Sequence, residues 1–144
     1  MRALVRDGPV AVDTCVFIYF IESDPEWLPV VRPLFASAGT GDGSLVTSSL
    51  TLHEVLVIPY RSGDLALAAR YEGLLTRSRG LAMIEMDRPM VRAAAQLRAR
   101  YRLKMPDSFQ IAAALAARCT SFVTNDRKIP DIPGLRIVQL NELV

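Results

Sequence analysis

Short apolar runs alternate with longer segments of helical periodicity along the chain. The short runs are rich in Val, Leu and Ile, and runs of this length and composition are typical of buried β-strands. They occupy residues 9–13 (PVAVD), 45–48 (LVTS), 81–86 (LAMIEM), 121–125 (SFVTN) and 134–140 (GLRIVQL). The pattern therefore predicts five strands spread over the whole length of the chain.

The segments between these runs carry helix signals. Ser48 or Ser49 is placed to cap a helix over SLTLHEVLVIPY, Asp87 is placed to cap RPMVRAAAQLRARYRL, and Pro106 suits the first turn of another helix. Further helices are expected over TCVFIYFIE, over 25–38, where Pro29 and Pro33 interrupt the pattern, and over 64–78, whereas 39–44 (GTGDGS) is expected to be a loop.

Strands that alternate with helices of ten or more residues favour an α/β fold. In such folds a central parallel sheet is flanked by helices on both faces, which gives three layers. The chain has 144 residues, a common size for one domain, so we expect a single domain over residues 1–144. The order of the strands cannot be read from the sequence.

Composition excludes several classes of protein. No apolar run approaches the ~18–20 residues that span a bilayer, and the amino-terminal MRALVRDGPVAVD lacks the unbroken apolar stretch of a signal peptide, so we expect a cytoplasmic protein. Cys15 and Cys119 are too few for a structural zinc site and are expected to be small buried side chains.

Four acidic residues are predicted to meet at one edge of the sheet. Asp13 ends the first strand, Asp126 follows the fourth, and the carboxyl ends of parallel strands share an edge. Asp107 lies in the first turn of the helix that runs back before the fourth strand, so it starts at the same edge. Glu54 lies early on the helix after LVTS, in an otherwise apolar stretch where an unpaired acid is costly.

Each of these acids also has a purely local explanation. Asp13 can be a helix cap, Asp107 suits the positive end of a helix dipole, Asp126 can be a turn residue, and Glu54 can pair with an Arg. All four local explanations would have to be true independently of one another. We therefore favour the interpretation that the four acids form one cluster.

A carboxylate cluster on this chain points to metal-dependent phosphate chemistry. Neighbouring carboxylates repel unless they are protonated or bind a cation, and oxygen-only ligands favour one or two Mg²⁺ or Mn²⁺ ions. With four acids gathered in one site, the rest of the chain carries 17 basic against 11 acidic residues, which suits a polyanion. The hypothesis is a phosphodiesterase in which metal ions activate water.

Four segments resemble the PIN-domain nucleases, and in length the chain is similar to the VapC-type toxins of toxin–antitoxin pairs. The segments are AVDTCVFIYFIE, SSLTLHEVLV, MPDSFQIAAALAARCTSFVTNDRK and IPGLRIVQLNEL. The resemblance implies that Asp13, Glu54, Asp107 and Asp126 form the acidic metal-binding and catalytic quartet.

The same resemblance implies supporting roles and partners. Thr14 matches the hydroxyl residue after the first acid, and Thr124 and Asn125 match a T-N-D segment that orients a ligand or water. It further implies a parallel sheet flanked by helices, Mg²⁺- or Mn²⁺-dependent endoribonuclease activity, a homodimer and a small antitoxin that silences the enzyme.

Other residues leave alternatives open. The basic segment 92–104 is either a solvated helix face or an RNA contact, with Lys104 as its best candidate, and Trp27 belongs either to the core or to a partner groove. His53 is expected to be structural or interfacial. Two rival functions stand beside the endoribonuclease: a PIN-like domain that binds RNA or protein without cutting, and a phosphoryl-transfer domain with Asp13 as nucleophile. For the second, Cys15 stands where a general acid is needed.

Overall fold

A five-stranded parallel sheet forms the centre of the protein. The computed structural model describes residues 2–41 and 43–144, with side chains from residue 4. The strands follow the order β3-β2-β1-β4-β5 across the sheet, so the first strand of the chain is the central one. Their bounds are β1 Val10–Val12, β2 Leu45–Ser48, β3 Leu81–Ile84, β4 Ser121–Thr124 and β5 Arg136–Gln139.

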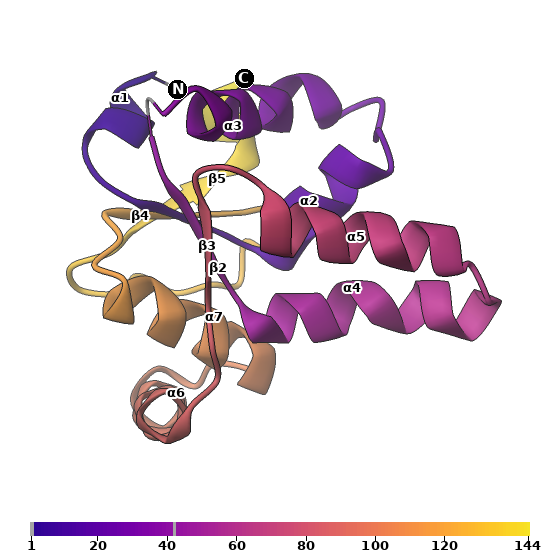
Figure 1. Cartoon of the computed structure of the whole chain (residues 1–144). Helices are drawn as coiled ribbons and strands as arrows, with labels where there is room; N and C mark the ends of the chain where they lie inside the picture. The colour runs from indigo at the N-terminus through magenta and orange to yellow at the C-terminus, as the bar shows by residue number, and fades with distance from the viewer. Residues whose placement is uncertain (1, 42) are drawn as a thin grey trace.

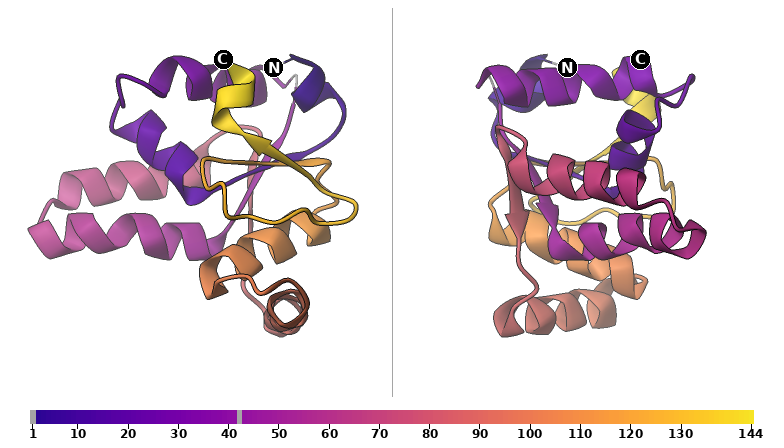
Figure 2. Two further views of the ribbon diagram at one scale, coloured as in Figure 1. Left: turned by 180° about the vertical axis from the view of Figure 1, so that it is seen from behind. Right: turned by 45° about the vertical axis from the view of Figure 1, so that its right-hand side comes forward.

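Helices cover both faces of the sheet, as Figure 1 shows. On one side α7 (Met105–Ala116) packs on β1, β2 and β4, and α6 (Arg88–Tyr101) packs on the outside of α7. On the other side lie α2 (Thr14–Ile21), α3 (Leu28–Thr40) and α5 (Leu65–Arg77), and α5 pairs with α4 (Ser49–Ser62) in a long hairpin that extends away from the sheet (Figure 2). This arrangement confirms the predicted three-layer α/β fold.

The core lies on both faces of the central strands. Val10, Val12 and Val123 point to one side, where they pack with Phe17 and Leu34 of the helices above. The opposite side of the same strands contributes Ala11, Val46 and Phe122, which pack against Ile111 and Ala114 of α7. Since both faces are covered, the strands are apolar at nearly every position, as is usual in parallel sheets.

The alanine-rich helix α7 serves two interfaces. Ala114 and Ile111 face the sheet, whereas Ala112 and Ala113 pack against α4 and α6 around Met90. Small side chains on α7 therefore let α6 approach closely and form a second, outer helix on this side.

Three local predictions differ from the structure. Helix α3 runs to Thr40, so the first two residues of the expected loop 39–44 are helical, and Pro33 lies inside the helix. The strand expected over 81–86 ends at Ile84. Two short elements were not predicted, namely α1 (Arg2–Arg6) and the 3₁₀ helix η1 (Leu140–Leu143). Within the described residues, no helix combines the length and the apolar character needed to cross a membrane.

Candidate active site

Asp13 stands where the central strand β1 ends and α2 begins. Its Oδ1 accepts the backbone N–H of Thr14 at 2.8 Å, so Asp13 caps α2, which agrees with its local explanation as a helix cap. Its Oδ2 accepts the hydroxyl of Thr124 at 2.7 Å, from the end of the neighbouring strand β4. The same carboxylate can therefore cap the helix and also take part in a larger site.

Thr124 connects Asp13 to Asp126. The Thr124 side chain is fully buried, and its oxygen accepts the backbone N–H of Asp126 at 3.0 Å while its hydroxyl donates to Asp13. The Asp126 carboxylate in turn accepts the backbone N–H of Lys128 at 2.9 Å, which folds the following residues into a turn. One hydroxyl thus fixes how two acids stand relative to each other.

Glu54 reaches the site from α4 through Thr14. The Thr14 hydroxyl donates to Glu54 Oε1 at 2.8 Å, and Thr14 itself lies directly after Asp13. The two carboxylates therefore lie on either side of one residue, although they are 41 positions apart in the chain.

Asp107 lies in the first turn of α7 and is coupled to the other three acids by charge. Partial burial, followed by the charges of Asp13 and Asp126, raises the pKa of Asp107 from 3.8 to about 6, against a lowering effect of Lys104. Burial also raises the pKa of Asp13, with smaller contributions from Glu54 and Asp126. Carboxylates that resist ionisation because of one another occupy a common site.

The four elements that carry the acids explain why they converge. Asp13 and Asp126 follow the central strands β1 and β4, while α4 and α7 begin at the same edge of the sheet because α4 leaves the end of β2 and α7 runs antiparallel to the strands. Ligand sites of open parallel sheets form at this carboxyl edge.

A buried polar network that the sequence did not predict holds Thr14 in place. Gln110 donates through Nε2 to Thr51 at 2.6 Å and to Thr14 at 3.2 Å, and its Oε1 accepts the Ser48 hydroxyl at 3.1 Å. Gln110 is only 3% exposed. A glutamine in an apolar, alanine-rich helix was the signal available, because a buried amide requires partners. Ser48, expected to cap α4 with its side chain, uses its hydroxyl here instead.

The other residues singled out from the sequence fall outside this cluster or beside it. Asn125 donates its amide to the Tyr19 hydroxyl at 3.1 Å, and Tyr19 stacks on the partly buried Trp27, which also packs against the core. His53 and Asp131 are exposed. The single histidine therefore takes no part in the site that the acids form.

The two cysteines are free and mostly buried, as expected. Burial, and then the charge of Asp13, raises the pKa of the Cys15 thiol to about 12, and burial raises that of Cys119 to about 11. Both thiols are therefore protonated near neutral pH. A cysteine that acts as a nucleophile or as a metal ligand does so as the thiolate.

The donor set determines which cofactor could fit. Among the described residues, no three side chains of His, Cys, Asp or Glu lie close enough to form a ready-made metal cage. The acids nevertheless form a set of oxygen donors in which burial, and then the neighbouring charges, raise the pKa of Asp13 and Asp107, and a cation would favour their ionised forms. Such a donor set suits a hard divalent ion such as Mg²⁺ or Mn²⁺ and does not suit zinc.

A large cavity lies away from these carboxylates. Its volume is about 460 Å³, and it is an apolar groove between α6 and α7 lined by residues such as Leu97, Tyr101 and Leu115. A smaller cavity of about 230 Å³ includes Asp107 in its wall. The chemistry of the acids, and not cavity size, identifies the candidate active site.

Solved structures share this fold over nearly the whole chain. The VapBC2 complex of Rickettsia felis bound to a promoter DNA fragment contains a chain that matches with a TM-score of 0.70 and 18% identity, covering 91% of this chain and 98% of that one. DNA-bound VapBC from Salmonella typhimurium gives 0.66 and 24%, covering 92% and 98%. Mycobacterium tuberculosis VapC20, a toxin that cleaves the sarcin–ricin loop, gives 0.67 and 15%, covering 83% and 91%.

A family model agrees with the resemblance read from the sequence. No curated protein matches the chain. The model of the PIN domain matches residues 10–135, a range that includes all four acids and the strands β1 to β4 and ends just before β5. The chain belongs to the PIN-domain family.

Proposed function

We propose that this protein is a metal-dependent endoribonuclease that cleaves RNA phosphodiester bonds and acts in the cytoplasm as the toxin of a toxin–antitoxin pair. The observation that carries the proposal is the convergence of Asp13, Glu54, Asp107 and Asp126 from four separate elements, with pKa values of Asp13 and Asp107 raised by burial and by the neighbouring acids. The family and the net basic character outside the cluster support a nucleic-acid substrate.

The residues of the chain would bind and orient the ions and the substrate. Asp13, Glu54, Asp107 and Asp126 would hold one or two Mg²⁺ or Mn²⁺ ions. When bound, such ions activate water and stabilise the leaving oxygen of a phosphodiester. Thr14 and Thr124 keep the carboxylates in fixed orientations through the hydrogen bonds described above, which limits the reorganisation needed on binding.

The phosphoryl-transfer alternative is disfavoured by the surroundings of Asp13. Both of its carboxylate oxygens accept hydrogen bonds, and the residue two positions further, Cys15, has a thiol with a raised pKa in place of a second acid. The alternative of a PIN-like domain that binds without cutting is disfavoured as well, because a scaffold with no cation to bind gains nothing from four neighbouring acids.

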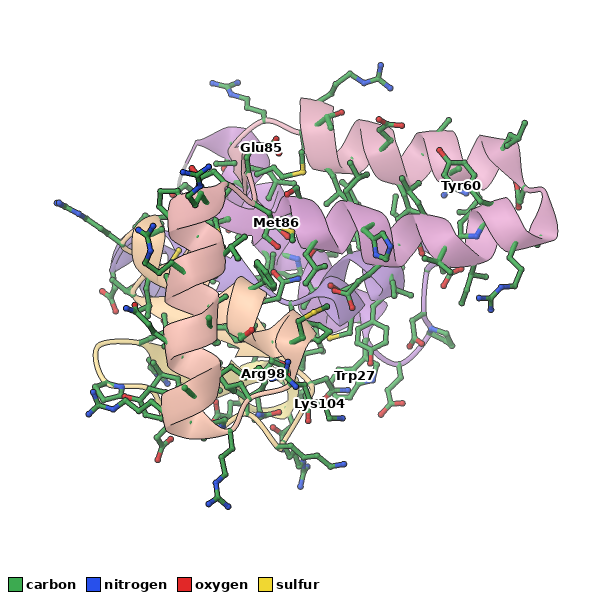
Figure 3. All side chains as sticks on the ribbon, turned by 90° about the horizontal axis from the view of Figure 1, so that it is seen from below. Trp27, Tyr60, Glu85, Met86, Arg98 and Lys104 are labelled. Atoms are coloured by element: carbon green, nitrogen blue, oxygen red, sulfur yellow. The ribbon has the colours of Figure 1, made fainter. Side chains whose placement is uncertain are left out.

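The partner proposals rest on the solved relatives and on the surface. Several of the matched structures are complexes of a toxin with its antitoxin, which supports a small antitoxin partner for this chain. The α4–α5 hairpin exposes Ile58, Tyr60 and Leu65, with exposed fractions of 68%, 56% and 69%. Figure 3 shows Tyr60 towards the outer end of that hairpin. We propose that the protein forms a homodimer and binds an antitoxin, which co-expression and size-exclusion chromatography would test.

Cleavage of RNA by the purified protein tests the central proposal. We expect cleavage with Mg²⁺ or Mn²⁺, none with EDTA, and loss of cleavage in Asp13→Asn and Asp107→Asn. An asparagine at position 13 keeps the cap of α2, so the folded structure should survive.

Asp87→Asn is the matched control. Asp87 caps α6 through the Met90 N–H at 3.0 Å and is not one of the four acids, and asparagine preserves that role. Its cleavage rate should equal that of the wild type. Retention of cleavage in both Asp13→Asn and Asp107→Asn would show that the site has been assigned wrongly.

A further inference from the structure

A basic cavity adjoins the candidate active site. Its volume is about 230 Å³, well above the ~10–15 Å³ that a single water needs, and it lies where the chain passes from α6 into α7 and where the turn after Asp126 comes close. Figure 3 labels Lys104 at this connection, at the end of α6 opposite Glu85 and Met86. The wall includes Tyr101, Arg102, Lys104, Asp107, Lys128 and Pro130.

The cavity has an excess of positive charge, although Lys104 interacts electrostatically with Asp107. Arg102, Lys104 and Lys128 are exposed cations, against the single carboxylate of Asp107. Within the described part of the chain, none of these three cations forms an ion pair. Three cations around one concave space attract an anion with several oxygens, such as phosphate.

Two features of the fold place the cavity next to the carboxylates. Asp107 lines the cavity and is coupled by charge to Asp13 and Asp126. Lys128 is held by its backbone N–H, which donates to the Asp126 carboxylate at 2.9 Å. A phosphate in the cavity would therefore lie beside any phosphate held at the acids.

Arg102 ends α6 with a left-handed backbone. Its φ is 54°, in the region that favours glycine or asparagine, at the position where a helix commonly ends in glycine. Replacement of Arg102 by glycine should therefore remove the guanidinium from the cavity without a loss of stability.

We propose that this cavity binds a phosphate of the RNA strand adjacent to the phosphate that is cleaved. The proposal rests on the endoribonuclease function above and adds to it a substrate-binding site formed by Arg102, Lys104 and Lys128. The cations engage a phosphate that does not react, so the site supplies binding and register along the strand and takes no part in the chemical step. It needs no metal ion, because its charge comes from side chains alone.

The chain contains a matched pair of arginines for the test. Arg102 and Arg118 are both exposed, both follow a helix, and have φ values of 54° and 56°. Only Arg102 lines the cavity, whereas Arg118 lies beyond the other end of α7 from Asp107. Arg102→Gly and Arg118→Gly therefore make the same change of charge and relieve the same backbone conformation at two ends of one helix.

Binding of a fluorescein-labelled single-stranded RNA is measured by anisotropy in EDTA over a range of KCl concentrations. Wild type and Arg118→Gly should bind with the same dependence of log K on log[KCl]. Arg102→Gly and Lys128→Gln should each bind several-fold more weakly, with a slope reduced by about 0.7, the value for one phosphate contact on a single strand. Thermal unfolding should show Arg102→Gly to be as stable as the wild type or more stable, which separates lost binding from lost folding.

Three results would overturn the cavity assignment. The first is that the wild type does not bind RNA in EDTA, and the second is that Arg118→Gly and Arg102→Gly lose the same amount of RNA affinity. The third is that inorganic phosphate at constant ionic strength fully displaces the RNA, which would mean that the cavity takes free phosphate. Cleavage with Mn²⁺ by the wild type distinguishes failure of this proposal from failure of the nuclease function. An active enzyme whose Arg102→Gly variant keeps its salt dependence is a nuclease without this phosphate site.

Discussion

Removal of the charge on Asp107 should stabilise the metal-free protein at neutral pH. The folded protein raises the pKa of this carboxyl from 3.8 to about 6, first through burial and then through the charges of Asp13 and Asp126. Asp107→Asn replaces the carboxylate with an uncharged group of the same shape. We therefore expect a variant that loses cleavage and at the same time gains stability, as is common when a functional site is strained.

The sign and size of the effect follow from linkage. Between about pH 4 and about pH 6 the folded protein keeps a proton on Asp107 that the unfolded chain has released, so the free energy of unfolding falls as the pH rises through this window. The difference between 3.8 and about 6 corresponds to about 3 kcal/mol. Because Asp107 is partly exposed and solvent screens its neighbours, we expect about 1–2 kcal/mol.

Urea unfolding of the wild type and Asp107→Asn in EDTA, at about pH 4 and about pH 7.5, measures this contribution. The two proteins should be about equally stable at the lower pH, and the variant should be more stable by about 1–2 kcal/mol at the higher pH. Saturating Mn²⁺ at the higher pH should then stabilise the wild type by about 2.7 kcal/mol at a hundredfold excess over Kd, and the variant less. A stability difference that does not change with pH would refute the argument that Asp107 is held among like charges.

Three further predictions concern the support of the site and the fold. Thr14→Val removes the hydroxyl that donates to Glu54 at 2.8 Å and should lower the free energy of unfolding by about 1–3 kcal/mol in urea, with slower RNA cleavage at fixed Mn²⁺. Gly80→Ala should lower the free energy of unfolding by at least about 2 kcal/mol in thermal unfolding, which is more than Gly41→Ala should cost. Both glycines have positive φ, but only at Gly80 would an added Cβ meet the Ala38 backbone. Equal losses of stability in the two variants would exclude the steric explanation. Phe122→Ala, in the fully buried core, should cost about 3–5 kcal/mol by urea unfolding, and a loss under about 1 kcal/mol would show that this side of the sheet is loosely packed.

The strands and most helix starts could be predicted because their signals are local. LVTS matches β2 at both ends, and Asp87 accepts the backbone N–H of Met90, as expected of a helix cap. Helix α3 was harder, because Pro33 was expected to interrupt it. Its missing N–H removes one hydrogen bond near the start of the helix, and burial of Val31, Leu34 and Ala38 outweighs that loss.

The grouping of the four acids could be predicted from the sequence, but the polar network beside them could not. The edge shared by the carboxyl ends of parallel strands predicted that Asp13, Asp107 and Asp126 would converge, and their electrostatic coupling agrees with that expectation. The hydrogen bond from Ser48 to Gln110 joins residues 62 positions apart, and no local pattern marks such a pair. The same holds for the basic cavity, since Arg102 and Lys128 meet only through the packing of α7 beside the turn after β4.

The central position of β1 has a consequence for the synthesis of the protein. Asp13 is fixed by the Val123 carbonyl and the Thr124 hydroxyl of β4, so the first acid of the candidate site cannot be held in place before the strand that begins at Ser121 has been made. At ~5–20 residues per second, a ribosome needs roughly 6–20 s to make the residues that separate Asp13 from Asp126. During that interval the nascent chain carries at most three of the four carboxylates and no assembled site. The proposed endoribonuclease would thereby stay inactive until β4 and Asp126 have been synthesised.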